Sequence, residues 1–164
     1  MRKSTKNLAL LSVSVALAMM LSFIESRLPT FVPIPGVKLG LANIAVIFTL
    51  YKQGIWQAAA VSSVRVLLSA MLFGTPVSAV YSLAGAAVSL IGMVILARVV
   101  RMHTVGVSIA GGVLHNAGQI AVACIILETN VIIYYLPYLV ISGTLAGIAV
   151  GTASALLIKR IKLV

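Results

Sequence analysis

Apolar residues form long, nearly uninterrupted runs along this chain, and short polar segments separate them. Six such runs cover residues 8–24, 39–51, 55–73, 77–100, 105–127 and 131–158. A helix that spans a bilayer needs about 20 mostly apolar residues, with a lower limit of about 17. Every run except the second reaches that limit. The pattern predicts an all-α fold, a polytopic six-helix transmembrane bundle that forms one domain over residues 1–164.

The polar breaks between the runs contain residues that end helices. Three prolines exclude a regular helix within the segment 25–38. Lys, Gln and Gly at 52–54 and Gly, Thr and Pro at 74–76 separate the next runs. Pro137 lies inside the sixth run, where a proline either kinks the helix or marks a later start. Because the second run is short, the sequence leaves open whether it crosses the bilayer completely.

The composition also indicates a lipid environment. Apolar residues make up 62% and charged residues 9% of the 164 residues, and the mean hydropathy is +1.19. Soluble domains are about half apolar and a quarter charged, and a fold this small cannot hide such an apolar excess from water. The first run imitates a signal peptide and contains Ala16-Leu17-Ala18. We expect it to remain as a helix, because nothing after it has the composition of a soluble protein.

Basic residues are distributed unevenly between the two sides of the predicted bundle. The net charge is +10, from 12 Lys and Arg against 2 acids. With the N-terminus inside, nine basic residues are cytoplasmic: Arg2, Lys3, Lys6, Lys52, Arg98, Arg101, Lys159, Arg160 and Lys162. Only Arg27 and Lys38 lie outside, and Arg65 lies within a run. The bias predicts a multi-pass cell-membrane protein with both termini cytoplasmic, and such clusters fit membrane flanks better than a nucleic-acid surface.

Polar side chains within the apolar runs are the candidates for function, because such groups are costly in a membrane and are usually paired or functional. They come from different runs, yet most fall in the predicted outer half of the bilayer. This convergence predicts a pocket that opens to the outside, covered by the proline-rich loop. The candidate substrate-binding residues are Lys38, Asn43, Arg65, Tyr81, His115, Asn116, Gln119 and Tyr135.

The charges near this pocket favour an anionic ligand. Arg27, Lys38 and Arg65 have one carboxylate nearby, Glu25, and the planar fork of arginine suits carboxylate or phosphate. Each candidate also has a structural interpretation. Arg65 could snorkel or pair with a helix carbonyl, and the segment 115–119 could join helices by hydrogen bonds. The tyrosines could form an interfacial belt, the loop cations could face lipid head groups, and Glu25 could pair with a loop cation.

The sequence contains no constellation typical of catalysis. Glu25 and Glu128 are its only acids, and aspartate is absent. His103 and His115 lie on different segments, Cys124 has no second cysteine to pair with, and no Walker A motif is present. We therefore predict that the chain is not an enzyme by itself and has neither a metal site nor a cofactor.

Small residues recur at helical spacing in several runs and allow helices to approach closely. They serve either packing within the bundle or contact with a partner, and the first alternative is favoured for any single ridge. The ridges are Ser12/Ala16/Met20, Ser14/Ala18/Ser22, Gly85/Ser89 and Gly143/Gly147/Gly151.

Several short motifs together resemble a known family. They are PGVKLGLANI at 35–44, RVLL at 65–68, LFG at 72–74, YSLAG at 81–85, HNAGQ at 115–119 and YYLP at 134–137. In these motifs the chain resembles the family labelled heptaprenyl diphosphate synthase component I, or Gx transporter. That family is similar to the substrate-binding S components of energy-coupling factor (ECF) importers, and the resemblance covers nearly the whole chain.

The resemblance implies a membrane subunit that captures a vitamin-like or isoprenoid-related, anionic molecule from outside. Its implied partners are a transmembrane coupling protein and two cytoplasmic ATPases. The first helix would contact the coupling protein through small residues, here Ser12 and Ala16 or Ser14 and Ala18. The enzyme label implies an alternative, a non-catalytic accessory subunit of a prenyl diphosphate synthase. The absence of aspartate argues against catalysis by this chain, because such synthases hold magnesium and diphosphate with aspartate clusters.

Overall fold

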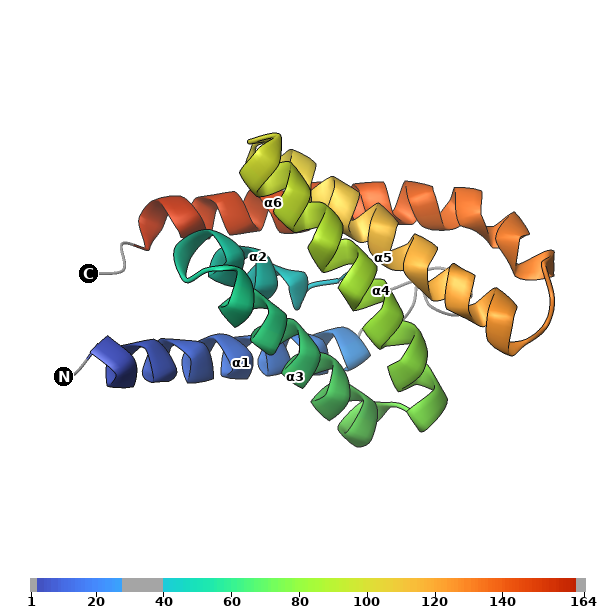
Figure 1. Cartoon of the computed structure of the whole chain (residues 1–164), viewed down its shortest axis with the longest axis horizontal. Coiled ribbons are helices and arrows are strands. Elements are labelled where there is room, and N and C mark those ends of the chain that lie inside the picture. Colours follow the sequence, from blue (N-terminus) through green and yellow to red (C-terminus); the bar gives the residue numbers. More distant parts are fainter. Residues whose placement is uncertain (1–2, 28–39, 162–164) are drawn as a thin grey trace.

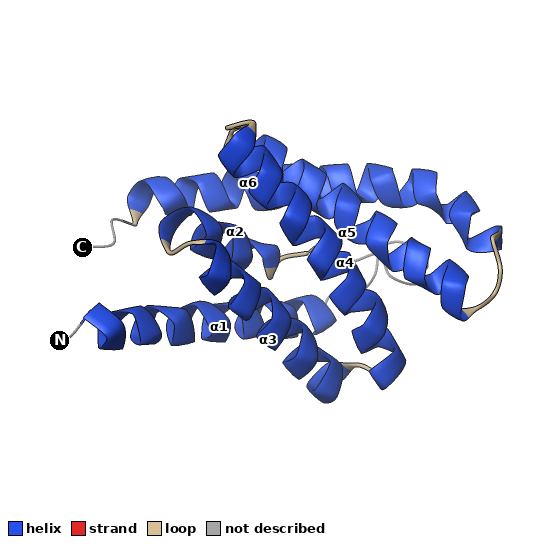
Figure 2. Cartoon of the chain, viewed as in Figure 1, coloured by secondary structure: helices blue, strands red, loops and turns tan. Residues whose placement is uncertain are grey.

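The computed structural model describes residues 3–27 and 40–161, and this part of the chain is helical and contains no strand (Figure 2). The all-α prediction is confirmed. A π-helical turn, η1, continues the fourth helix, and a 3₁₀ turn, η2, precedes the last. The elements are α1 (Lys3–Arg27), α2 (Asn43–Lys52), α3 (Ile55–Phe73), α4 (Pro76–Val94), η1 (Ile95–Val99), α5 (Thr104–Ile126), η2 (Val131–Tyr135) and α6 (Leu136–Arg160).

Five helical segments are long and apolar enough to cross a membrane, and they contain α1, α3, α4, α5 and α6. They agree with five of the six predicted spans. The sixth, α2, has only 10 residues. At about 1.5 Å per residue it is about 15 Å long, half of the roughly 30 Å hydrocarbon core of a bilayer. Five of the predicted spans are therefore supported, and α2, for which the sequence left a complete crossing open, is too short to cross alone.

The short helix α2 lies at the centre of the bundle, in contact with α1, α3 and α6. Its residues from Ala45 to Leu50 are all buried, as expected for a helix that is apolar on every side. Gly54 then adopts a φ of +130° in the turn to α3, a conformation that favours glycine. Arg98 of η1 donates a hydrogen bond of 2.8 Å to the carbonyl of Leu50 and so satisfies an orphan acceptor near the end of α2.

Glycine contacts bring α5 close to α4 on one side and to α6 on the other. A Cβ added at Gly147 would lie 2.5 Å from Cα of Ile109, and one at Gly118 would lie 3.0 Å from Cα of Gly85. Such distances leave no room for a side chain. Of the predicted ridges, Gly143/Gly147/Gly151 therefore packs on α5 within the bundle, and so does Gly85/Ser89 of α4, since the hydroxyl of Ser89 donates to the Gly111 carbonyl.

Two helix starts follow from local sequence. Thr75 caps α4 and forms a reciprocal capping box with Ser78, and Pro76 occupies the first turn. Pro137 likewise lies in the first turn of α6, after the 3₁₀ turn, where its missing N–H is not required. Of the two alternatives for Pro137, the structure therefore shows a later helix start.

The start of α1 and the end of α6 lie at the same end of the bundle, together with the turn between α2 and α3 (Figure 1). The connection between α5 and α6 lies at the opposite end (Figure 1). This arrangement agrees with an even number of crossings, although which end is cytoplasmic stays a prediction. Large apolar side chains remain exposed along the outside, such as Trp56 at 85% and Met71 at 82%, which suits a surface in contact with lipid.

Candidate functional site

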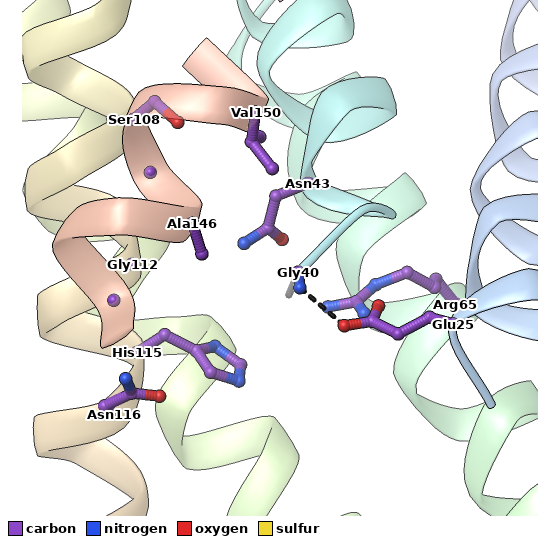
Figure 3. Close-up of a pocket in the computed structure, with 12 residues that line it drawn as sticks. Glu25, Gly40, Asn43, Arg65, Ser108, Gly112, His115, Asn116, Ala146 and Val150 are labelled. Atoms are coloured by element: carbon purple, nitrogen blue, oxygen red, sulfur yellow. Dashed lines mark hydrogen bonds between the residues drawn. The ribbon is translucent and has the colours of Figure 1, made fainter. Parts of the chain in front are cut away.

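A polar cavity lies inside the bundle between α2 and α3 on one side and α5 and α6 on the other (Figure 3). The cavity has a volume of about 50 Å³, counted as the space that the centres of water molecules can occupy. One ordered water needs about 10–15 Å³ by this measure, so the cavity has room for a few waters or for one compact group such as a carboxylate or phosphate. Its lining residues are Glu25, Gly40, Asn43, Arg65, Ser108, Gly112, His115, Asn116, Gly143, Ala146, Gly147 and Val150.

Arg65 is the cation of this cavity. It lies near the middle of α3, deep in the bundle, and keeps some accessible surface because it lines the cavity. Its Nε atom is buried and has no hydrogen-bond partner within the described residues. A buried, unsatisfied donor on a charged group is costly. The burial of Nε is therefore left uncompensated, and an oxyanion in the cavity would contact the part of the Arg65 side chain that remains accessible.

Glu25 brings the opposite charge to the same place from the last turn of α1. Its Oε1 accepts a hydrogen bond of 2.5 Å from the backbone N–H of Gly40, and its carboxylate interacts electrostatically with Arg65. Figure 3 shows the two charged groups next to each other beside Gly40. The described cavity therefore contains one cation and one anion that offset each other.

Gly40 and Asn43 form the entry into α2. Gly40 has a φ of +70°, which favours glycine, and its carbonyl accepts the N–H of Asn43 at 2.9 Å. The amide side chain of Asn43 extends into the cavity (Figure 3). Because α2 begins here, the positive end of its helix dipole lies at the cavity. A half-length helix that ends at a polar site inside a bundle is a recurring arrangement for binding anions in membrane proteins.

His115 and Asn116 line the cavity from the middle of α5. Asn116 is buried, and its Nδ2 donates a hydrogen bond of 2.8 Å to the carbonyl of Leu139 on α6. That bond joins the two helices, as the structural interpretation of this segment predicted. Asn116 therefore combines a packing role with a place on the cavity wall.

The structure brings together four of the eight predicted substrate-binding residues, namely Asn43, Arg65, His115 and Asn116. Three others are not among the lining residues. Gln119 is one turn further along α5, with its Cγ against Gly85. Tyr81 lies on α4, and Tyr135, on η2, is 46% exposed. Lys38 and most of the proline-rich loop lie outside the described residues.

Sequence reasoning did not assign several lining residues to the site. Gly112, Gly143 and Gly147 face the cavity where α5 and α6 approach each other. The glycine ridge of α6 was a visible signal, but it indicated packing and carried no hint of a site. Neither Ser108 nor Gly40 could be singled out as a site residue. Ser108 is a small polar residue within an apolar run, and Gly40 is one of several glycines next to a loop.

The two small-residue faces of α1 have different environments. Ser14 and Ala18 are buried, and the hydroxyl of Ser14 accepts a hydrogen bond of 2.7 Å from Gln53. They pack against the rest of this chain, which leaves no surface there for a partner. Ser12 and Ala16 are exposed on the other face. Of the predicted partner residues, only these two remain accessible.

The fold and the cavity define a class: a small, apolar, polytopic helical bundle with a compact ionic cavity at its centre. The sequence profile of the family described as heptaprenyl diphosphate synthase component I matches residues 14–157. The chain belongs to this family, as its motifs predicted. No significant match is found among curated proteins or among solved structures.

Proposed function

We propose that this chain is a non-catalytic membrane subunit that binds a small molecule through an anionic group in the central cavity. The observation that carries the proposal is the Arg65 side chain, a cation that lines the cavity and whose buried Nε has no hydrogen-bond partner among the described residues. The start of α2 and the amides of Asn43 and Asn116 would complete the polar surroundings. The volume suits the head group of a ligand, with any longer part outside the cavity.

The family description supports one setting for this activity, a prenyl diphosphate synthase with this chain as an accessory subunit. The chain has no aspartate and only two glutamates, and among the described residues no group of three His, Cys, Asp or Glu could hold a metal ion. In this setting a separate, aspartate-rich subunit would perform the catalysis. An isoprenoid phosphate would then be a suitable ligand.

The cavity supports a second setting, the S component of an ECF-type importer. Six helices, a central polar cavity and an exposed Ser12/Ala16 face on α1 are compatible with it. The ligand would be an anionic vitamin-like molecule captured from outside. The partners would be a transmembrane coupling protein and two ATPases.

Native mass spectrometry of the protein purified in mild detergent tests the binding function. We expect a small phosphate- or carboxylate-bearing molecule to remain bound to the wild type and to be lost from Arg65→Gln. The matched control is Arg160→Gln, which removes an exposed arginine at the end of α6 and should keep the ligand. Equal occupancy in Arg65→Gln, with elution as a single folded species, would refute the role of Arg65.

Affinity purification from native membranes separates the two settings. Recovery of an aspartate-rich prenyl synthase without ATPases would support the first. Recovery of two ATPases and a coupling protein would support the second. The variant Ala16→Leu changes an exposed position of α1. It should disrupt an assembly that uses the Ser12/Ala16 face and leave the binding of the small molecule unchanged.

A further inference from the structure

The cavity already contains an oxyanion, the carboxylate of Glu25. Its Oε1 accepts the Gly40 N–H in front of α2, and its charge acts on Arg65. These are the two positive features that an incoming anion would need. Resting on the proposed function, we propose that Glu25 is a built-in counter-ion that occupies the anion position, and that the ligand's carboxylate or phosphate binds by displacing it.

Charge balance in the bundle supports displacement. Among the described residues that line the cavity, Arg65 and Glu25 are the charged ones, and their charges cancel. A second anion placed beside Glu25 would leave an excess negative charge in a medium of low dielectric constant, which is strongly disfavoured. Exchange of the Glu25 carboxylate for a ligand carboxylate keeps the charges of Arg65 and the anion balanced, and exchange for a phosphate leaves less excess negative charge than binding beside Glu25 would.

The position of Glu25 on α1 permits this movement. It is the third residue from the end of the helix and is half-buried, so a change of side-chain rotamer carries its carboxylate towards the end of the bundle, away from the apolar core. The core residues Ala45, Ile47 and Leu50 lie in the opposite direction, along α2. The two residues that follow Glu25 in α1, Ser26 and Arg27, are exposed, so a carboxylate turned towards them would lie at an accessible part of the helix.

The neighbouring cation does not compete for the same role. The guanidinium of Arg27 lies 5.2 Å from the centroid of the Phe23 ring and is exposed. That contact is a cation–π interaction on the outside of α1. Within the part of the chain that the structure describes, Arg65 therefore remains the cation of the cavity for which Glu25 and the ligand compete.

Displacement would also release the start of α2. In the structure Glu25 links α1 to Gly40, and Gly40 in turn accepts the N–H of Asn43. When the ligand takes the place of Glu25, the link between α1 and the entry of α2 breaks and a link from the ligand to that entry forms. Ligand binding is thereby converted into a change at the end of α1, the helix that also carries the exposed Ser12/Ala16 face.

Carbodiimide labelling of the wild-type protein tests the displacement directly. The chain has only two acidic side chains, Glu25 and Glu128, and Glu128 is exposed and serves as an internal reference. Inorganic diphosphate, inorganic phosphate and acetate are the probes, so the arms distinguish phosphate from carboxylate ligands. We expect the labelling of Glu25, measured by peptide mass spectrometry relative to Glu128, to rise several-fold when a probe binds. Unchanged or reduced labelling at saturating probe would overturn the proposal.

Binding measurements on a variant provide the second test. Glu25→Gln keeps an oxygen acceptor for the Gly40 N–H and removes the competing charge, so diphosphate should bind about tenfold tighter than to the wild type in calorimetric titration. Equal or weaker binding to a variant with wild-type melting behaviour would overturn the displacement model. Such a result would indicate that Glu25 instead contacts a cationic group of the ligand or positions Arg65.

The outcomes also separate this proposal from the proposed function. Arg65-dependent binding without a gain in Glu25→Gln rejects displacement alone. If no probe binds either protein, or if binding survives Arg65→Gln, both proposals fail. The double variant Glu25→Gln/Arg65→Gln should bind none of the probes, which shows that any gain from Glu25→Gln acts through Arg65.

Discussion

Substitution of Gly147 by alanine tests the contact on which the cavity wall depends. The added Cβ would lie 2.5 Å from Cα of Ile109 and 3.0 Å from both its N atom and the carbonyl oxygen of Ser108. These are backbone atoms of α5, so no rotamer change can relieve the overlap. Carbon atoms normally approach to about 3.5–4.0 Å, so α5 and α6 must separate by about 1 Å at this point.

Overpacking of this kind costs about 1–3 kcal/mol, and the better helix propensity of alanine offsets about 1 kcal/mol of it. We expect a net destabilisation of up to about 2 kcal/mol, which is up to about a 30-fold shift in the unfolding equilibrium. The measurement is reversible SDS denaturation in mixed micelles, followed by far-UV circular dichroism.

Gly106→Ala, in the first turn of α5, is the matched control. There the nearest atoms are Sδ and Cγ of Met102 at 2.6 and 2.9 Å, and that side chain is flexible and 40% exposed. It can move aside, so stability should stay unchanged or rise slightly. If Gly147→Ala is as stable as Gly106→Ala, the close approach of α5 and α6 at Gly147 does not limit stability, and the reasoning is refuted.

Three further predictions concern packing and use the same denaturation assay. Asn116→Leu removes the hydrogen bond that joins α5 to α6 and should destabilise the protein by about 1 kcal/mol; no loss would mean that the bond is not formed in micelles. Arg98→Ala removes the partner of the Leu50 carbonyl and should cost less than about 1 kcal/mol, because Arg98 is largely exposed. Ala18→Leu should cost more than about 2 kcal/mol, because Ala18 is 0% exposed. Ala16→Leu, on the exposed face of α1, should leave stability unchanged, and equal losses from these two alanine substitutions would contradict the assigned faces.

The helical elements were largely predictable from the chain because their signals are local. The run 55–73 coincides with α3, and the run 105–127 differs from α5 by one residue at each end. Apolar length and the glycines and prolines between runs determine such boundaries. The first helix is longer than its apolar run, from Lys3 to Arg27, since polar residues at the ends of a long helix can extend beyond the apolar layer.

The site was predictable only in part, because polarity within an apolar run identifies a candidate but not its direction. Arg65 and His115 line the cavity, whereas Gln119, one helical turn beyond His115, does not, although both α5 side chains lie close to Gly85 of α4. The described lining of α5 ends at Asn116, and only the tertiary structure decides where along α5 the cavity ends. Tyr81 and Tyr135 carried the same polar signal without lining the cavity.

The sequence by itself determined that the chain is a bundle of apolar helices, where most of them begin and end, and which family it belongs to. These properties depend on composition and on neighbours in the chain. Only the tertiary structure decided that Ser14 and Ala18 are buried while Ser12 and Ala16 are exposed, and that Glu25 lies beside Arg65 and Gly40. Those relations depend on how helices distant in sequence rotate and cross, for example where Gln53 after α2 donates to Ser14 of α1 and where the N–H of Gly40 donates to Glu25.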